Sequence, residues 1–226
     1  LSRGLGDVYK RQELITVYEV VRDDVDELIE LLRGYPNESD FFYSMRALDR
    51  SPEFAHLSRV ERAARTIYLN KTCYNGLYRV NNAGQFNAPF GRYANPTICD
   101  EPNLREVSEY LASHDVAFSN GDYAALEANE GDFVYFDPPY DPVNPTSNFT
   151  GYQSGGFGRA DQIRLKETCD ALDARGVKFL LSNSATDFIT ELYADYRVET
   201  VKATRAVNSV ASKRGKVNEV LVRNYA

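Results

Sequence analysis

The sequence has few of the residues that hold metal ions or form disulfides. Its 226 residues include no tryptophan, two histidines and three cysteines. The cysteines (Cys73, Cys99 and Cys169) form no C-x-x-C pair, and His56 and His114 have no partners at metal-ligand spacing. This scarcity argues against a cysteine-held zinc ion and against a disulfide framework. It is typical of a reduced, intracellular protein without a metal cofactor.

Long apolar runs are also missing. No run approaches the length of a membrane span, and no stretch has the pattern of a signal peptide. The composition, with 43% hydrophobic and 26% charged residues, is that of an ordinary globular protein whose core needs no cross-links. We therefore expect a cytoplasmic protein, without membrane contact, that forms one domain or one domain with a large insertion.

Positive charge is scarce overall but locally concentrated. The net charge of −7 argues weakly against nucleic acid as a partner. Residues 58–95, however, carry six bases and one acid, and residues 197–223 carry seven bases and two acids. Such segments suit a nucleic-acid-binding face, although solvated surface charge explains them equally well.

The order of predicted elements indicates the fold class. Apolar spacing predicts helices over 13–33, around Phe41–Leu48, after the Ser58/Glu61 capping box, and over Leu104–Leu111 with Asn103 as its cap. The second half alternates between predicted strands and helices: Phe133–Phe136, Ile163–Ala174, Val177–Leu181, Phe188–Tyr193, Val198–Ala203 and Asn218–Asn224. This alternation is typical of an α/β sheet with helices on its faces.

A proline-rich motif follows the first of these strands. Phe133–Phe136 leads directly into Asp137, Pro138, Pro139 and Tyr140. In open α/β sheets, ligands bind at the carboxyl ends of strands. Two prolines fix the backbone and remove two N–H donors, which leaves a rim of acceptors, the Asp137 carboxylate and the Pro138 carbonyl. A helix start with Asp137 as its cap is the alternative interpretation.

This rim suits a planar molecule that bears an amino group. Two acceptors can hold both N–H bonds of the amine while Tyr140 stacks on the ring. Accepting both protons raises electron density on the nitrogen, so that its lone pair can attack an electrophilic methyl group. The chemistry needs no metal and no nucleophilic side chain, because catalysis comes from positioning and electrostatics.

The motif and its surroundings resemble the Dam family of DNA adenine methyltransferases. Four stretches carry the resemblance: YLNKTCYNGLYRVNNAGQFNAPFGRY (68–93), DFVYFDPPYDPVNPTSNFTGYQSGGF (132–157), LLSNS (180–184) and KRGKVNEVLVRNY (213–225). The resemblance implies a Rossmann-like methyltransferase sheet, S-adenosylmethionine as methyl donor, and a mainly helical target-recognition insertion. It also implies base flipping, because the target atom cannot be reached inside a duplex.

The resemblance assigns regions and roles along the chain. The catalytic domain would comprise 13–33 and 115–226, the recognition insertion 34–114, and residues 1–12 would be a tail foreign to the family. The Asp137–Tyr140 motif would hold the flipped adenine, and Asp137 would also lie near the methionine end of the donor. Asp122 and Tyr123, at the end of a preceding strand over 119–123, would lie near the donor's adenine.

Double-stranded DNA is the partner that the resemblance implies, with a monomeric enzyme. Tyr74 and Asn75 would lie at the flipping site, and Leu77, Arg79 and Pro89 would contact bases of a short palindrome, which we expect to be GATC. Phosphate contacts would come from the basic helix Arg59–Lys71 and a basic turn near the C-terminus. The further DNA-binding residues expected are Arg92, Lys213, Arg214 and Lys216. From the residues alone, an Asn- and Gly-rich segment such as 73–99 is more often a plain turn.

The chain departs from the family at its start. The family begins with a K-W-x-G-G-K segment, a strand and an F-x-G-x-G loop that approaches the cofactor, and the sequence before Glu13 has neither. We therefore expect a sheet without its first strand or strands, which leaves the activity of this chain open. Two alternatives remain: methylation of RNA or another amino-bearing substrate, and a catalytically silent DNA-binding fragment.

Overall fold

The computed structural model describes residues 5–81, 83–143, 157–204 and 216–226. The chain divides into two compact units, residues 1–121 and 122–226. Residues 13–33 fall in the first unit, where they pack with the helices that follow them. The catalytic and recognition regions expected from the sequence remain a prediction. Each unit is described by itself.

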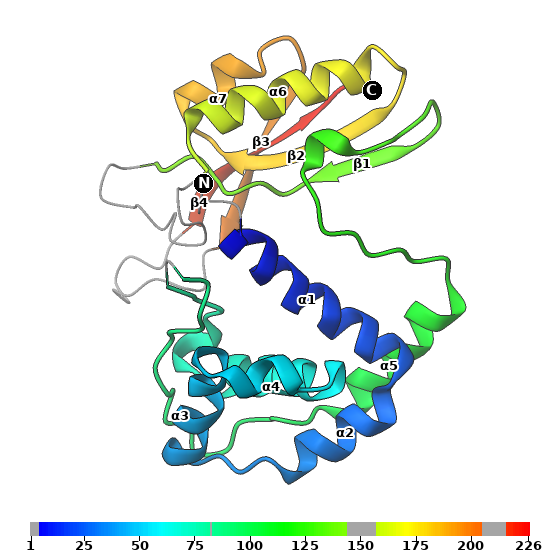
Figure 1. The fold of residues 1–226 in the computed structure, drawn as a ribbon. Coiled ribbons are helices and arrows are strands. Elements are labelled where there is room, and N and C mark those ends of the chain that lie inside the picture. Colours follow the sequence, from blue (N-terminus) through cyan, green and yellow to red (C-terminus); the bar gives the residue numbers. More distant parts are fainter. Residues whose placement is uncertain (1–4, 82, 144–156, 205–215) are drawn as a thin grey trace. The chain divides into compact units, whose positions relative to one another are not determined.

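The first unit is mainly helical (Figure 1). Helix α4 packs against α1, α2 and α3, and α5 packs against α1 and α2. Their apolar faces enclose one core, in which Leu28, Phe42, Ala63, Tyr68 and Leu69 are fully buried. The elements of this unit are α1 (Leu5–Asp23), α2 (Val25–Gly34), α3 (Ser39–Ala47), η1 (Leu48–Arg50), η2 (Pro52–His56), α4 (Arg59–Thr72), η3 (Tyr74–Gly76) and α5 (Glu101–Ser113).

Helix boundaries follow local chemistry, with two corrections. The capping box of Ser58 is confirmed: its hydroxyl accepts from the Glu61 N–H, and the Glu61 carboxylate accepts from the Ser58 N–H. The single helix expected over 13–33 is wrong, because Asp24 leaves helical geometry (φ −134°, ψ 35°) and separates α1 from α2. Asn103 is not a cap, because α5 begins at Glu101 with a proline in its first turn, where a missing N–H costs nothing.

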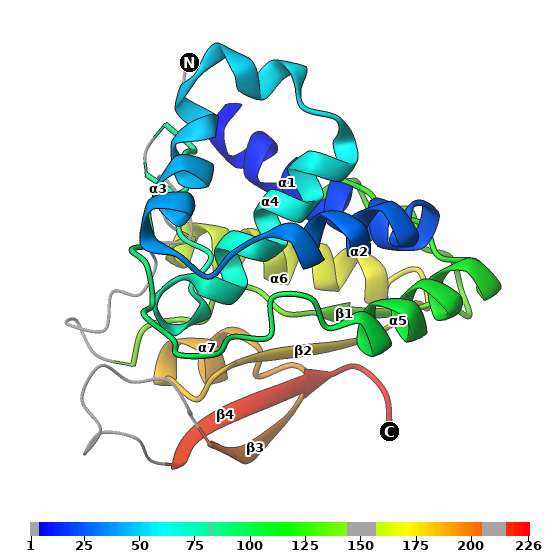
Figure 2. The same ribbon diagram turned by 90° about the horizontal axis from the view of Figure 1, so that it is seen from below.

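The second unit contains a mixed sheet. Its elements are η4 (Tyr123–Ala125), β1 (Phe133–Phe136), α6 (Arg159–Asp173), β2 (Lys178–Ser184), α7 (Asp187–Leu192), β3 (Arg197–Thr204) and β4 (Lys216–Arg223). The four described strands lie in the order β1-β2-β4-β3 (Figure 2). β1 and β2 are parallel, and α6 connects them, whereas β4 is antiparallel to both β2 and β3. The expected α/β class, and the strands and helices expected after Phe133, are confirmed.

The core of this unit lies on the side of the sheet that α6 and α7 cover (Figure 1). Phe136, Phe179 and Leu181 pack there against Leu165 and Cys169 of α6. Side chains alternate across a strand, so the neighbours of these residues point to the opposite face. Phe133 and Tyr135 of β1 are more than half exposed there, at 56% and 55%. In the part of the chain that the structure describes, no helix is long and apolar enough to cross a membrane.

Candidate active site

The Asp-Pro-Pro-Tyr motif lies at the carboxyl end of β1, as expected. Phe136, the last residue of β1, is buried opposite Leu181 of β2. Asp137 comes next and is exposed, so its carboxylate is accessible from outside the unit. Because β1 and β2 are parallel, their carboxyl ends meet at one edge, and this edge is where α/β sheets bind ligands.

Ser182 of β2 is the side chain that orients Asp137. Its hydroxyl donates to an Oδ of Asp137 over 3.0 Å and lies 3.1 Å from the Tyr135 hydroxyl. Burial raises the pKa of Tyr140, in the same motif, above its ordinary value. Tyr140 therefore remains an uncharged, half-buried ring beside the carboxylate.

A buried amide network fixes the backbone of the motif from the α6 side. The Gln162 amide donates to the Pro139 carbonyl over 2.9 Å, and the Asn183 amide donates to the Gln162 carbonyl oxygen over 3.1 Å. The Asn183 oxygen accepts from the Asp141 N–H over 2.9 Å. Both amide side chains are buried, so these bonds are shielded from water.

Beyond the motif, Asp141 anchors the chain. Its carboxylate is 4% exposed and accepts from the Thr186 hydroxyl over 2.8 Å. Since Gln162 takes the Pro139 carbonyl, the acceptors that the motif can offer a ligand are the Asp137 carboxylate and the Pro138 carbonyl. A fixed pair of acceptors beside a tyrosine ring can hold a planar amine.

Asp122 and Tyr123 lie at η4 rather than at the end of a strand, so the strand expected over 119–123 is wrong. The Asp122 carboxylate caps η4 by accepting from the Ala124 N–H over 2.9 Å. It also accepts two bonds from Arg164 of α6, at 2.8 and 3.0 Å. The Arg164 guanidinium lies 5.1 Å from the centre of the half-buried Tyr123 ring. Burial raises the pKa of Tyr123, so this ring is also uncharged.

The segment expected to recognise DNA forms a hairpin in the first unit. Antiparallel bridges join Cys73 to Phe90 and Val80 to Phe86. We call residues 73–81 and 83–91 the recognition hairpin. Asn81 closes its turn, because its side-chain oxygen accepts from the Ala83 and Gln85 N–H groups, both over 3.0 Å.

The two faces of the recognition hairpin differ. Cys73, Phe86 and Ala88 are buried in the core of the unit. Leu77 is half-buried. Four other hairpin residues expected to contact DNA (Tyr74, Asn75, Arg79 and Pro89) are exposed, as is Arg92, which follows the hairpin directly. Two of these, Asn75 and Arg92, have left-handed backbone with φ 55° and 54°, a conformation that asparagine tolerates better than most residues. The hairpin thus presents one set of side chains to solvent and anchors the other.

Exposed Arg79 and half-buried Asn87 bond to each other across the hairpin. The Arg79 guanidinium donates to the Asn87 side-chain oxygen over 2.8 Å and to the Asn87 carbonyl over 3.1 Å. The Asn87 N–H donates to the Arg79 carbonyl over 2.9 Å. Arg79 is therefore held at a defined place on the exposed face.

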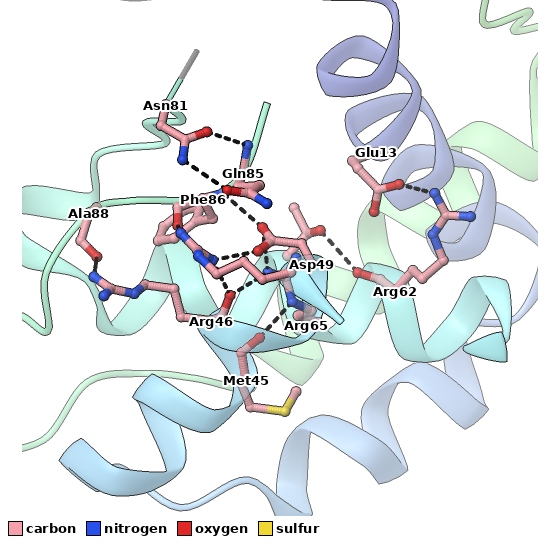
Figure 3. Close-up of polar contacts among 12 residues, drawn as sticks. Glu13, Met45, Arg46, Asp49, Arg62, Arg65, Asn81, Gln85, Phe86 and Ala88 are labelled. Atoms are coloured by element: carbon pink, nitrogen blue, oxygen red, sulfur yellow. Dashed lines mark hydrogen bonds and ion pairs between the residues drawn. The ribbon is translucent and has the colours of Figure 1, made fainter. Parts of the chain in front are cut away.

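A buried ion pair anchors the inner face (Figure 3). The Asp49 carboxylate is 3% exposed and accepts from Arg65 over 2.8 Å and from the Phe86 N–H over 2.7 Å. Arg50 donates to the Phe86 carbonyl over 2.7 Å, and Arg46 donates to the Ala88 carbonyl over 3.2 Å. We call Asp49, Arg46, Arg50 and Arg65 the hairpin clasp.

Phosphate contacts were expected from the helix Arg59–Lys71, but its three arginines pair with acidic residues of the first unit. Arg59 pairs with Asp23 and Asp24, Arg62 pairs with Glu13, and Arg65 is buried in the hairpin clasp. Lys213 and Arg214 lie outside the described residues. Lys216 begins β4, and only its backbone is described.

Sequence reasoning missed Ser182, Gln162, Asn183 and Asp49. Ser182 and Asn183 directly follow the strand predicted over Val177–Leu181. This position was the available signal, because parallel strands meet at their carboxyl ends. Nothing in the sequence marked Gln162 or Asp49. Among the described residues, no group of three or more His, Cys, Asp or Glu side chains could hold a metal ion.

An α/β sheet whose strand ends in this motif, in a chain with a separate helical unit, has the organisation of an amino-methyltransferase. Residues 11–207 match the family model of the D12 class N6 adenine-specific DNA methyltransferases. The match covers most of the chain, which therefore belongs to this family of site-specific, adenine-specific DNA methyltransferases.

Individual relatives agree with the family model. The chain is 43% identical to a type II methyltransferase of Lactococcus lactis subsp. cremoris over 217 residues, 94% of this chain and 76% of the relative. It is 43% identical to a type II methyltransferase of Methanocaldococcus jannaschii over 227 residues, 95% of this chain and 78% of the relative. It is 36% identical to the DNA adenine methylase of Serratia marcescens over 223 residues, 96% of this chain and 80% of the relative.

Proposed function

We propose that this protein transfers a methyl group from S-adenosylmethionine to the 6-amino group of an adenine flipped out of double-stranded DNA, with GATC as its target sequence. The observation that carries the proposal is the exposed Asp137 carboxylate at the carboxyl end of β1, oriented by Ser182 and followed by a backbone that Gln162 and Asn183 hold. The second unit would perform the chemistry, and the recognition hairpin of the first would read the sequence.

The described residues fit a bound methyl donor in part. The exposed Asp137 carboxylate can accept from the α-ammonium group at the methionine end, and the half-buried Tyr123 ring can pack on the adenine. Asp122 fits less well than the sequence indicates, because Arg164 already takes both of its oxygens. S-adenosylmethionine supplies an electrophilic methyl group on its sulfonium sulfur.

The residues of the motif would act on the target amine. Asp137 and the Pro138 carbonyl would each accept one N–H bond, which concentrates electron density on the nitrogen as it attacks. Tyr140 would stack on the base and fix its plane. Ser182 and Gln162 would keep the acceptors in place, so that little reorganisation accompanies the reaction.

On the DNA, the exposed residues of the recognition hairpin would divide two tasks. Tyr74 is 53% exposed and follows the end of α4, so its ring could fill the space that a flipped base leaves. Leu77, Arg79 and Pro89 would contact base edges, since arginine pairs with guanine and apolar groups contact the thymine methyl. Arg92 and the basic residues Lys213, Arg214 and Lys216 would contact phosphates.

The test is a methylation assay with the purified chain, radiolabelled S-adenosylmethionine, a GATC duplex, a scrambled duplex and an RNA stem. We expect N6-methyladenine in the GATC duplex alone. Asp137→Ala should lower the rate to less than a tenth and leave duplex binding intact, because Asp137 acts on the extruded amine. Preferred methylation of the RNA would overturn the proposed substrate. Duplex binding without cofactor binding, measured by calorimetry, would show a silent DNA-binding protein.

A further inference from the structure

Exposed Arg79 and half-buried Asn87 form a fixed pair on the outer face of the recognition hairpin. Three hydrogen bonds of 2.8, 2.9 and 3.1 Å connect the two residues, and two of them hold the Arg79 guanidinium itself. An exposed arginine without such bonds samples many rotamers and loses that freedom when it binds a ligand. The bonds to Asn87 already restrict the rotamers of Arg79 in the free protein, so Arg79 loses less conformational entropy when it binds.

The way in which Asn87 holds Arg79 selects the edge of the guanidinium that remains available. Asn87 receives the Nε–H and one Nη2–H, which lie on one side of the planar group. The other side-by-side donors, on Nη1 and Nη2, form the end of the fork. Two parallel donors at this end match the O6 and N7 acceptors that guanine presents in the major groove.

The two residues next to Asn87 are hydrogen-bonded through their backbone to the hairpin clasp. The Phe86 N–H donates to Asp49, and the Ala88 carbonyl accepts from Arg46 (Figure 3). The Phe86 carbonyl accepts from Arg50. Side chains of successive residues in an extended chain point to opposite sides. Because the hairpin clasp holds residues 86 and 88 on the inner side, the side chain of Asn87 points to the outer side. The orientation of Arg79 therefore traces back to the buried Asp49–Arg65 pair.

We propose that Asn87 is a positioning residue for sequence recognition: it acts through Arg79, presenting the end of that guanidinium to a guanine, rather than by reading a base itself. The proposal rests on the proposed function, in which Arg79 contacts a base. The specificity of the enzyme then depends on a pair of residues in which the arginine provides the donors and the asparagine sets their direction.

The experiment measures equilibrium binding of the full chain to a GATC duplex and to an AATT duplex of the same length at one salt concentration. The readout is the ratio of the two dissociation constants, which a general loss of stability does not change. A bidentate arginine–guanine contact corresponds to a ratio of about tenfold or more. We expect Arg79→Ala to reduce the ratio to about 2 or less and Asn87→Ala to reduce it at least threefold.

Three further variants sharpen the test. The double variant Arg79→Ala with Asn87→Ala should discriminate no worse than Arg79→Ala alone, because Asn87 acts only through Arg79. Asn87→Asp keeps the acceptor and should retain the ratio while weakening both duplexes through its negative charge. Asn81→Ala is the matched control: it loosens the turn of the same hairpin without touching Arg79, and it should leave the ratio unchanged.

Different failures have different signatures. If Arg79→Ala leaves the ratio as in the wild type, the base-reading role of Arg79 is wrong, and the role of Asn87 is wrong with it. If Arg79→Ala abolishes discrimination but Asn87→Ala weakens both duplexes equally, Asn87 touches the DNA directly and only the positioning role is wrong. If Asn81→Ala loses as much discrimination as Asn87→Ala, the loss comes from a less stable hairpin, and the proposal is overturned.

Discussion

The Ser182 hydroxyl donates to the Asp137 carboxylate over 3.0 Å, which joins the ends of two parallel strands at the candidate catalytic residue. This bond uses one acceptor position of an oxygen and fixes the rotation of the carboxylate. The remaining acceptor positions then point in set directions, which matters when an amine must be held in one plane. Ser182 therefore orients the Asp137 carboxylate.

Ser182→Ala should lower the rate of methyl transfer about tenfold or more, because a hydrogen bond to a charged group contributes about 1.5–3 kcal/mol. Duplex binding should stay as in the wild type. Single-turnover kinetics at saturating DNA separates the two quantities. Ser182→Thr, which keeps the hydroxyl, serves as the matched control and should recover most of the rate. An unchanged rate in the alanine variant would remove Ser182 from the orientation of Asp137.

Asp49→Ala should destabilise the first unit by about 3–5 kcal/mol. Asp49 and Arg65 are 3% and 5% exposed, so removing the carboxylate leaves a buried guanidinium uncompensated and the Phe86 N–H without its acceptor. Urea unfolding followed by circular dichroism measures the change. Asp115→Ala, at an exposed position of the same unit, should change stability by less than about 0.5 kcal/mol. Equal effects of the two substitutions would contradict the role of the hairpin clasp.

Lys216→Ala should weaken binding to all duplexes about equally and reduce the salt dependence of binding by about one unit of log–log slope, as expected for one lost phosphate contact. Binding to GATC and scrambled duplexes at several salt concentrations provides the measurement. The matched comparison is Arg79→Ala, which should act mainly on discrimination. A Lys216 variant whose salt slope equals that of the wild type would exclude a phosphate contact there.

Stability should fall at alkaline pH through the buried thiol of Cys169. Burial raises its pKa to about 12 in the folded protein, whereas an unfolded cysteine ionises near 8.5. Between these values the unfolded state has lost a proton that the folded state keeps, so stability is fully present below about pH 8.5 and decreases above it. The decrease is about 1.4 kcal/mol per pH unit for this thiol.

Urea unfolding of the wild type and of Cys169→Ala at pH 8, 9 and 10 tests this prediction. The variant is less stable at pH 8 because it leaves a cavity. Its stability should nevertheless depend less steeply on pH, so that the difference between the two proteins narrows toward pH 10. Parallel pH profiles would mean that the thiol ionises equally in the folded and unfolded states.

The second unit was largely predictable from sequence, and the reasons are local. Phe133–Phe136 is an apolar run that ends in two prolines, which fixes both the strand and its end. The strands and helices after it follow from apolar periodicity, and the structure has them within a few residues of the predicted bounds. The position of the Asp137–Tyr140 motif at the carboxyl end of a strand needed no tertiary information.

Partnerships between distant residues could not be predicted. Arg59, Arg62 and Arg65 suggest a basic surface in the sequence because the acids that pair with them come from other segments of the chain: Asp23, Asp24, Glu13 and Asp49. Ser182 gains its role only when β2 lies beside β1. The break at Asp24 was missed because the apolar period continues through it, and a period reports burial rather than backbone continuity.

The alternation of residues 86–88 in the recognition hairpin has a consequence for how such an enzyme can change. The inward residues are tied to the hairpin clasp, whereas Asn87 and its partner Arg79 stand on the outer side. Substitutions at the outer positions leave the clasp intact, so new target sequences can be explored without a loss of folding. A library randomised at residues 79 and 87 alone is therefore a small and well-tolerated search space for methyltransferases of altered specificity.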